Sequence, residues 1–305
     1  MRTAFIQQLI LEARLNPRIF LAVGDLGYSV VEPFVQEFPN RFLNAGVAEQ
    51  NMTGVAAGLA SEGYHVFTYS IANFPTLRCA EQIRNDIAYH GLSVTVVSVG
   101  GGLAYGNLGY SHHAVQDLAV MRSFPGLTLA CPGDPAEARA AVRFLTNNPC
   151  PSYLRLGKAG EPVIHSEVID IALNRLVPLR TTGEINLILT TGATLKLASD
   201  SLAQIPHTNY DLASLPLWSE AGKDELVAQL RRYRKIVTIE DHLHAGGFGS
   251  FVREALLAAD VNVQVKSVAL SSAVCGEVAS QAALNRLGGL SVETILSALQ
   301  DTCGL

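Results

Sequence analysis

Residues 93–100 (SVTVVSVG) form an uncharged run that is rich in β-branched side chains. Such a run is typical of a strand covered on both faces, as in a parallel sheet. Helical and strand-like patterns alternate around it through residues 1–160, which predicts βα units joined by right-handed crossovers. A second series begins at INLILTTGAT (185–194) and reaches a helix over 292–300. We therefore predict an α/β protein of two consecutive domains, each a mostly parallel sheet flanked by helices.

The alternating pattern is lost over residues 161–182, which indicates a connecting segment packed on a surface. We place a first domain at residues 1–165, a linker at 166–182 and a second domain at 183–305. The chain length of 305 residues agrees with an expectation of about two domains.

Composition narrows the classes of function. The chain is 49% hydrophobic and 16% charged, which suggests that apolar surface is buried between subunits. A net charge of −5 without a basic cluster argues against nucleic acid, and no apolar run reaches the ~20 residues that span a membrane. The five cysteines are odd in number and lack C-x-x-C spacing. We therefore expect no disulfide framework, no metal site in this chain and a cytoplasmic location.

Polar side chains follow several of the predicted strands, and the carboxyl ends of parallel strands meet at one edge of a sheet. The candidates are Asp25, Ser29, Glu49, Arg155 and the pair His112 and His113, which ends a Gly-rich loop. An acid, an imidazole and a guanidinium on one rim suit an enzyme with a polar transition state. Structural interpretations remain open at this point, such as a solvated Glu49 at a helix start or an Arg155 over the domain interface.

Four segments resemble the transketolase family and follow the family's order. AGVAEQNMTGVAAGLASEG resembles the segment that bears the thiamine-activating glutamate, and FTYSIANFPTLRCAEQIRND the one whose aromatic residue stacks on the aminopyrimidine. GYSHHAVQDLAVMRSFPGLTLACPGD resembles the loop with the substrate-side histidine, and EDHLHAGGFGS the signature of the C-terminal domain. The resemblance runs nearly end to end. It implies the C-terminal subunit of a split transketolase, with a pyrimidine-binding domain followed by a transketolase C-terminal domain.

The resemblance also implies roles for single residues. Glu49 would be the carboxyl that hydrogen-bonds the aminopyrimidine of thiamine diphosphate, and burial would keep it protonated. Phe74 would stack on the ring, and His112 would act catalytically on the donor substrate. The remaining expected contacts are Asp25 and Ile71 with the cofactor, and Arg2, Ser29, His113 and Arg155 with substrate.

Some positions depart from the family's pattern. Ile71 and Leu77 stand where family members carry two further aromatic residues. Leu108 stands where many sugar-transferring members have an acid, and a glycine near Gly100 replaces a histidine. These departures argue against a standard sugar phosphate and permit an unusual acceptor, while activation of the cofactor depends on none of them.

The family's diphosphate-binding motif is missing from this sequence. Family members hold the diphosphate through Mg²⁺ with a Gly-Asp-Gly motif, whereas here GD occurs only in GDL (24–26) and GDP (133–135). The charges of a diphosphate require a metal or several donors. We therefore predict an N-terminal transketolase subunit that supplies the diphosphate and Mg²⁺ domain, in an α₂β₂ complex acting on small sugars.

Alternatives remain beside this interpretation. The β subunit of a 2-oxoacid dehydrogenase E1 and the C-terminal part of a deoxyxylulose-phosphate synthase use a similar G-[IV]-x-E-Q segment. The EQIRND helix and the SHHAVQD loop favour the split transketolase. An alternative from another class is a non-catalytic dimerising paralogue, and the joint presence of Glu49, Phe74 and His112 argues against it.

Overall fold

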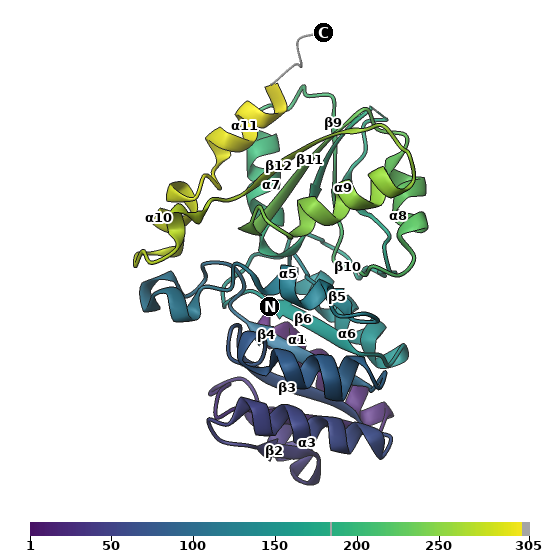
Figure 1. Ribbon diagram of the computed structural model, residues 1–305, viewed down its shortest axis with the longest axis vertical. Helices are drawn as coiled ribbons and strands as arrows, with labels where there is room; N and C mark the ends of the chain where they lie inside the picture. The colour runs from purple at the N-terminus through teal and green to yellow at the C-terminus, as the bar shows by residue number, and fades with distance from the viewer. Residues whose placement is uncertain (184, 301–305) are drawn as a thin grey trace.

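The computed structural model describes residues 1–183 and 185–300, and within them the strands form two sheets, in the lower and upper halves of Figure 1. The first sheet holds β1 (Ile19–Val23), β2 (Phe42–Asn44), β3 (His65–Ile71), β4 (Val94–Val99), β5 (Thr128–Ala130), β6 (Ser152–Leu156) and β10 (Leu217–Trp218). The second holds β7 (Val177–Arg180), β8 (Asn186–Thr190), β9 (Tyr210–Ser214), β11 (Lys235–Leu243) and β12 (Gln264–Leu270).

The order of strands is β10-β5-β6-β4-β3-β1-β2 in the first sheet and β12-β11-β8-β9-β7 in the second. Neighbouring strands run parallel except for β10 against β5 and β7 against β9. Every residue of β4 is buried, as its β-branched sequence predicts. The predicted α/β class with two mostly parallel sheets is confirmed.

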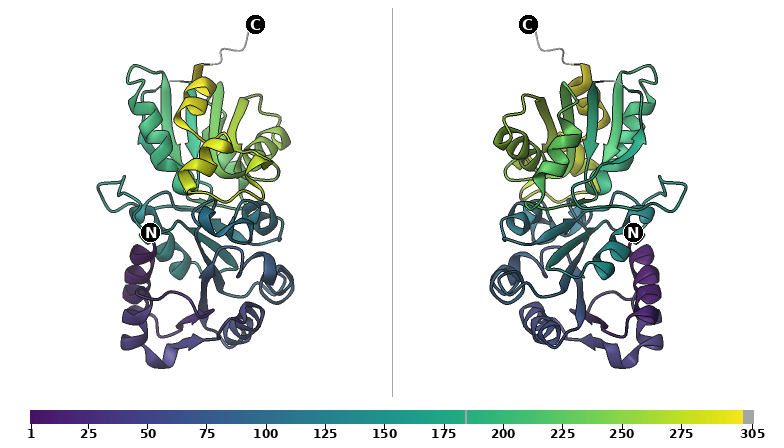
Figure 2. Two further views of the ribbon diagram at one scale, coloured as in Figure 1. Left: turned by 90° about the vertical axis from the view of Figure 1, so that its left-hand side faces the viewer. Right: turned by 90° about the vertical axis from the view of Figure 1, so that its right-hand side faces the viewer.

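Helices cover both faces of each sheet, as the two side views of Figure 2 show. The α-helices are α1 (Arg2–Leu15), α2 (Glu32–Glu37), α3 (Glu49–Ser61), α4 (Ala80–Gln82), α5 (Asp117–Arg122), α6 (Pro135–Asn147), α7 (Leu195–Ala203), α8 (Lys223–Leu230), α9 (Phe248–Ala258), α10 (Gln281–Leu287) and α11 (Val292–Gln300). Short 3₁₀ turns lie at Pro39–Arg41, Leu77–Cys79, Gly106–Leu108, Tyr110–His112, Gly192–Thr194 and Ser272–Val274. No helix of the described residues is long and apolar enough to cross a membrane.

The structure departs from the expected elements in three places. The helix predicted over 76–90 is a 3₁₀ turn, the short α4 and a π-helical segment at Ile83–Ala88. Strand β7 lies within the range proposed as a linker, and β10 joins the second half of the chain to the first sheet. The domain limits at residues 165 and 183 remain a prediction, and residues 184 and 301–305 lie outside the described part.

Parallel strands bring the ends of β1, β2, β3, β4 and β6 to one edge of the first sheet. The loops that follow these strands carry the residues expected at the site. Helix α3 begins at this edge, directly after β2, and packs against β3.

Candidate active site

Glu49 is the first residue of α3, and it is only 2% exposed. Gly24, at the end of β1, lies against it, since a Cβ at Gly24 would stand 3.3 Å from Glu49 Cγ. The same Cβ would stand 3.5 Å from the hydroxyl of Ser70, which is buried and has no hydrogen-bond partner in the described structure. A buried carboxyl group and an unused hydroxyl group therefore lie together beside a glycine.

The partner of Glu49 is Arg78, which the sequence analysis did not consider. Arg78 Nη1 donates a hydrogen bond of 2.6 Å to Glu49 Oε2, although 46% of the arginine side chain is exposed. The guanidinium carbon lies 4.8 Å from the centroid of the Phe74 ring, which is a cation–π distance. One signal for this contact was present in the sequence, because Arg78 follows Phe74 by four residues in a segment predicted as helical.

His112 contacts the other predicted aromatic residue of the site. Its ring centroid lies 5.2 Å from that of Phe74, with the two planes at 72°. Burial, and then the charge of neighbouring His113, lower the pKa of His112, so its ring is neutral at pH 7. Through Phe74, the imidazole joins the contacts of Arg78 and Glu49.

Asp25 is held in a tight loop after β1. It has a left-handed backbone (φ 54°), and its carboxylate Oδ1 accepts hydrogen bonds from Asn44 Nδ2 at 3.0 Å and the Tyr28 hydroxyl at 3.2 Å. Ser29 is also left-handed (φ 61°), and its backbone N–H donates to Glu32 Oε1 at 2.7 Å. Non-glycine residues in this conformation cost free energy and gather at functional sites. Asn44, which fixes Asp25, is a second residue that sequence reasoning missed.

Three other predicted residues lie around this edge. Ile71 ends β3, just before the loop that carries Phe74. Arg2 begins α1; burial raises the pKa of Tyr69 to about 12, and the charge of Arg2 opposes that rise. His113 is 1% exposed, and its Nε2 lies 3.3 Å from the carbonyl oxygen of Gly106, so this ring is turned into its own loop.

Arg155 lies at the contact between the two halves of the chain rather than beside Glu49. Its Nε donates to Asp117 Oδ2 at 2.6 Å and its Nη1 to Asp241 Oδ1 at 2.5 Å. Its Nη2 donates to the carbonyl oxygens of Ala114 and Asp241 at 2.9 and 3.2 Å. Burial lowers the pKa of Arg155, but the two carboxylates outweigh this and raise it well above its usual value. The structure thus gives Arg155 an interface role, and its predicted contact with substrate remains a prediction.

The EDHLHAGGFGS segment serves the start of α9. Glu240 Oε2 accepts the backbone N–H of Phe248 at 2.5 Å, and its Oε1 accepts that of Gly249 at 2.8 Å. A Cβ at Gly247 would collide with the same carboxylate, so glycine is required there. Burial raises the pKa of Glu240 to about 7. This signature therefore has a structural role in the second half of the chain.

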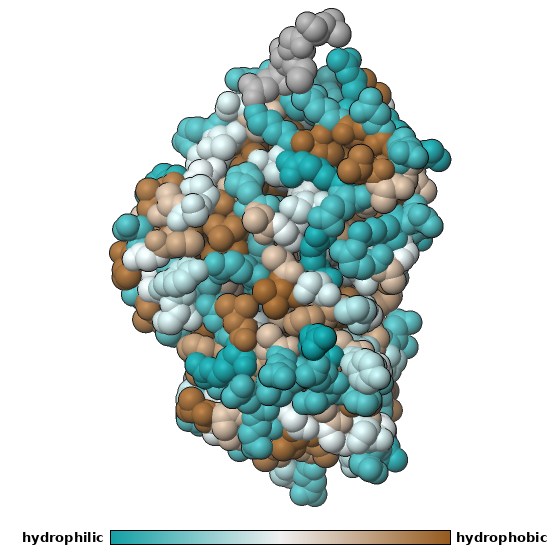
Figure 3. Space-filling model, viewed as in Figure 1, coloured by the Kyte–Doolittle hydropathy of each residue, from teal (hydrophilic) through white to brown (hydrophobic). Residues whose placement is uncertain are grey.

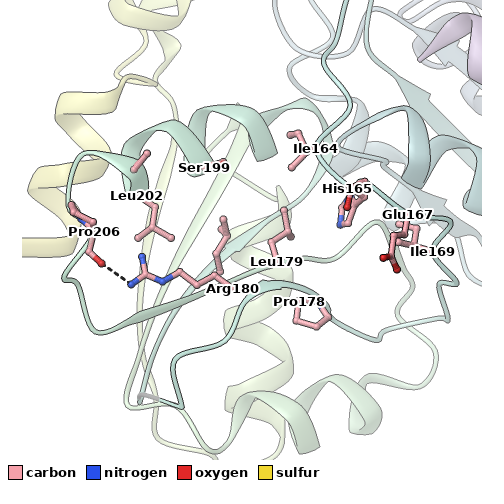
Figure 4. Close-up of a pocket in the computed structure, with 13 residues that line it drawn as sticks. Ile164, His165, Glu167, Ile169, Pro178, Leu179, Arg180, Ser199, Leu202 and Pro206 are labelled. Atoms are coloured by element: carbon pink, nitrogen blue, oxygen red, sulfur yellow. Dashed lines mark hydrogen bonds between the residues drawn. The ribbon is translucent and has the colours of Figure 1, made fainter.

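A cavity of about 600 Å³ lies between the connecting segment and the second sheet. Figure 4 shows Arg180 beside it, and its Nη2 donates to the carbonyl oxygen of Pro206 at 3.0 Å. His165 in the wall places its Nδ1 at 3.2 Å from Asp134 Oδ2. None of the predicted site residues lines this cavity.

Comparison with known proteins agrees with the geometry at the sheet edge. The family described as "Transketolase, pyrimidine binding domain" matches residues 1–160. The chain belongs to the transketolase family. The predicted family membership is therefore confirmed.

Relatives align along nearly the whole of this transketolase-family chain. One of the two chains of an apulose-4-phosphate transketolase of Phocaeicola vulgatus is 32% identical over 281 residues, 90% of this chain and 89% of that protein. A 6-deoxy-6-sulfo-D-fructose transketolase subunit of Clostridium sp. strain MSTE9 is 30% identical, over 99% of this chain and 94% of that protein. A solved split-gene transketolase, described as an inactive β4 tetramer, has a TM-score of 0.85 at 30% identity, covering 98% of this chain and 96% of that one.

Proposed function

We propose that this chain is one subunit of a split transketolase that depends on thiamine diphosphate. The enzyme would transfer a two-carbon ketol unit from a ketose donor to an aldehyde or ketone acceptor. The observation that carries the proposal is the buried carboxyl of Glu49, which lies at one sheet edge with Phe74 and His112. The full-length similarity to proteins described as transketolase subunits supports it.

These residues fit the ring end of thiamine diphosphate. When bound, the cofactor supplies the carbon nucleophile that ketol transfer requires. Glu49, in its protonated form, would donate a hydrogen bond to the ring nitrogen of the aminopyrimidine. Phe74 would orient the ring by stacking, and the unused hydroxyl of Ser70 offers a polar group beside the same carboxyl.

Residues farther along the rim would contact the sugars. The neutral ring of His112 can both donate and accept hydrogen bonds, which suits the hydroxyl groups of a ketose donor. The Asp25 carboxylate is fixed by Asn44 near the reacting centre. Arg2 and Ser29 would hold an anionic group of the acceptor.

A partner chain would complete the site. Large apolar side chains are exposed in the loops that follow β1, β2, β3 and β4: Tyr28 (72%), Val47 (76%), Leu77 (41%), Leu108 (50%) and Tyr110 (47%). Figure 3 shows more apolar surface on the side that carries α10. Exposed apolar surface of this kind marks an interface. We assign it to an N-terminal transketolase subunit that brings the diphosphate and Mg²⁺ domain, in an α₂β₂ assembly.

The acceptor is proposed to differ from a standard sugar phosphate, because Leu108 stands where many family members place an acid. The relatives above are named for apulose 4-phosphate and for a sulfo-deoxyfructose, which are both modified sugars. We place the enzyme in the cytoplasm, where free thiols such as the four described cysteines remain reduced.

Reconstitution of the complex tests this function. The chain is combined with its partner, thiamine diphosphate and Mg²⁺, and product analysis follows ketol transfer from a panel of ketoses to a panel of aldehydes. We expect transfer by the complex and its loss in Glu49→Gln, with Glu81→Gln, an exposed acid of α4, as the control.

Three outcomes would contradict the proposal in different ways. Ketol transfer by the isolated chain would refute the need for a partner. Decarboxylation of pyruvate without ketol transfer would favour the 2-oxoacid dehydrogenase or deoxyxylulose-phosphate synthase alternative. Full activity in Glu49→Ala would favour the non-catalytic paralogue.

A further inference from the structure

We propose that Arg78 occupies the place of the cofactor's aminopyrimidine while the cofactor is absent, and must withdraw before that ring can bind. This inference rests on the proposed function, because it takes Glu49 and Phe74 as the residues that receive the ring. It adds a residue that controls access to the site and the protonation state of its acid.

Arg78 makes both contacts expected of the aminopyrimidine. It donates a hydrogen bond of 2.6 Å to Glu49 Oε2, and its guanidinium carbon lies 4.8 Å from the centroid of the Phe74 ring. A guanidinium is planar and presents N–H groups at its edge, which resembles the amidine-like edge of an aminopyrimidine. One ring face and one carboxylate edge cannot hold both planar groups at once, so the two must compete.

The exposure of the two partners shows which one can leave. Glu49 is 2% exposed and cannot follow the guanidinium into solvent, whereas 46% of the Arg78 side chain already contacts solvent. An ion pair to such a half-exposed arginine contributes little net free energy, so its displacement by a ligand costs little. Arg78 therefore offsets the charge of Glu49 in the free chain without closing the site permanently.

Withdrawal requires the side chain to move rather than the backbone. Arg78 lies in the 3₁₀ turn Leu77–Cys79, which buried neighbours hold in place. Thr76 Oγ1 donates to the carbonyl oxygen of Ala72 at 2.5 Å, and Cys79 Sγ lies 3.4 Å from that of Phe74. The anchored turn leaves rotation of the arginine side chain as the simple route out of the site.

Exchange of the two groups changes the protonation of the site. With Arg78 in place, Glu49 is a carboxylate paired with a cation. When the guanidinium leaves, the carboxylate takes one proton from solvent and becomes the hydrogen-bond donor that the aminopyrimidine nitrogen needs. Binding of the cofactor is therefore coupled to proton uptake by Glu49, and this coupling depends on Arg78.

The test uses the reconstituted complex and titration calorimetry with thiamine diphosphate at a fixed Mg²⁺ concentration. Arg78→Gln removes the cation, and Arg78→Lys keeps the charge but loses the planar group. Arg84→Gln is the matched control, because Arg84 is exposed and is hydrogen-bonded to neighbouring Asn85. Titration in two buffers of different ionisation enthalpy gives the number of protons taken up per cofactor.

We expect Arg78→Gln to lower the Kd of the cofactor about fivefold, the change that corresponds to loss of a competing ion pair of about 1 kcal/mol. Arg78→Lys should give a smaller decrease, and Arg84→Gln none. Proton uptake should be larger in the wild-type complex than in Arg78→Gln. Circular dichroism of each variant checks that it is folded, and Arg78→Lys decides the matter if Arg78→Gln is not.

An unchanged or raised Kd in the folded Arg78 variants, with the cofactor still bound by the wild-type complex, would refute this role of Arg78 and leave the proposed function intact. Equal proton uptake in wild type and Arg78→Gln would refute it as well. If the wild-type complex bound no thiamine diphosphate at all, the proposed function would fall, and this inference with it.

Discussion

Arg155 and Arg78 both pair with acids near one edge of the first sheet, but they do so in opposite surroundings. The Arg155 side chain is 2% exposed and meets two buried acids, Asp117 and Asp241, across the two halves of the chain. The Arg78 side chain is 46% exposed and meets one oxygen of Glu49 within the first half. A buried arginine with all of its nitrogens engaged fixes an interface, whereas a half-exposed arginine on a buried acid can be exchanged for a ligand. The same pair of chemical groups therefore serves stability in one region and access in the other.

Loss of the buried guanidinium should give the largest effect on stability. Arg155→Met leaves the carboxylates of Asp117 and Asp241 buried without a cation, which should lower the free energy of unfolding by about 3–5 kcal/mol. Arg155→Lys, which keeps the charge but loses the fork, should fall between this variant and wild type. Urea unfolding measures the change, with the exposed Arg84→Met as control. A loss of less than about 1 kcal/mol would show that the interface does not depend on Arg155.

Glu49 should behave in the opposite manner, with a large effect on catalysis and a small one on stability. Glu49→Gln removes the carboxyl proton from the active site, so kcat of the reconstituted complex should fall at least about 100-fold. The free energy of unfolding of the chain should change by about 1 kcal/mol or less, because the exposed Arg78 stays hydrated without its partner. Steady-state kinetics and urea unfolding on the same preparations separate the two quantities. A large loss of stability would place Glu49 with the acids of the interface.

The interface should also respond to pH through Glu240. Burial raises the pKa of Glu240 from its usual 4.5 to about 7, so the unfolded chain releases this proton at a lower pH than the folded one. The stability that Glu240 contributes is therefore fully present below about pH 4.5 and is lost as the pH rises through about 7. Its contribution to the slope is at most about 1.4 kcal/mol per pH unit. Between these pH values, Glu240→Gln should lose less stability than wild type, and equal slopes in urea unfolding would contradict this.

The sequence was sufficient for the parallel sheets and insufficient for the elements that join or interrupt them. The buried run of β4 specifies its own environment, because β-branched residues on both faces need cover on both faces. Strand β10 has two residues, too few for any period, and it pairs antiparallel with β5 only because the second half of the chain folds back. The π-helical segment at 83–88 differs from an α-helix by its hydrogen bonds, which its residue types do not reveal.

The candidate site divides in the same manner. Glu49, Phe74 and His112 follow strand ends and stand in segments that resemble the transketolase family, so the sequence could locate them. Arg78 and Asn44 were missed because their roles depend on which way a side chain points across two elements, which periodicity does not determine. The same limit applies to Arg155, whose acids lie 38 and 86 residues away along the chain.

The smallest expected effect is on the stability of the free chain when Arg78 is removed. The place that Arg78 leaves opens to solvent, so water can hydrate the Glu49 carboxylate, and Arg78→Met should cost about 1 kcal/mol or less in urea unfolding. At about 1 M salt the Debye length shrinks to about 3 Å, so even this cost should diminish, while that of Arg155→Met should persist behind its buried surroundings. A double-mutant cycle with Glu49→Gln isolates the pair, and we expect a coupling of about 0.5–1 kcal/mol. A salt-independent coupling of several kcal/mol would instead make Arg78 a permanent clamp like Arg155, and the distinction between the two arginines would fail.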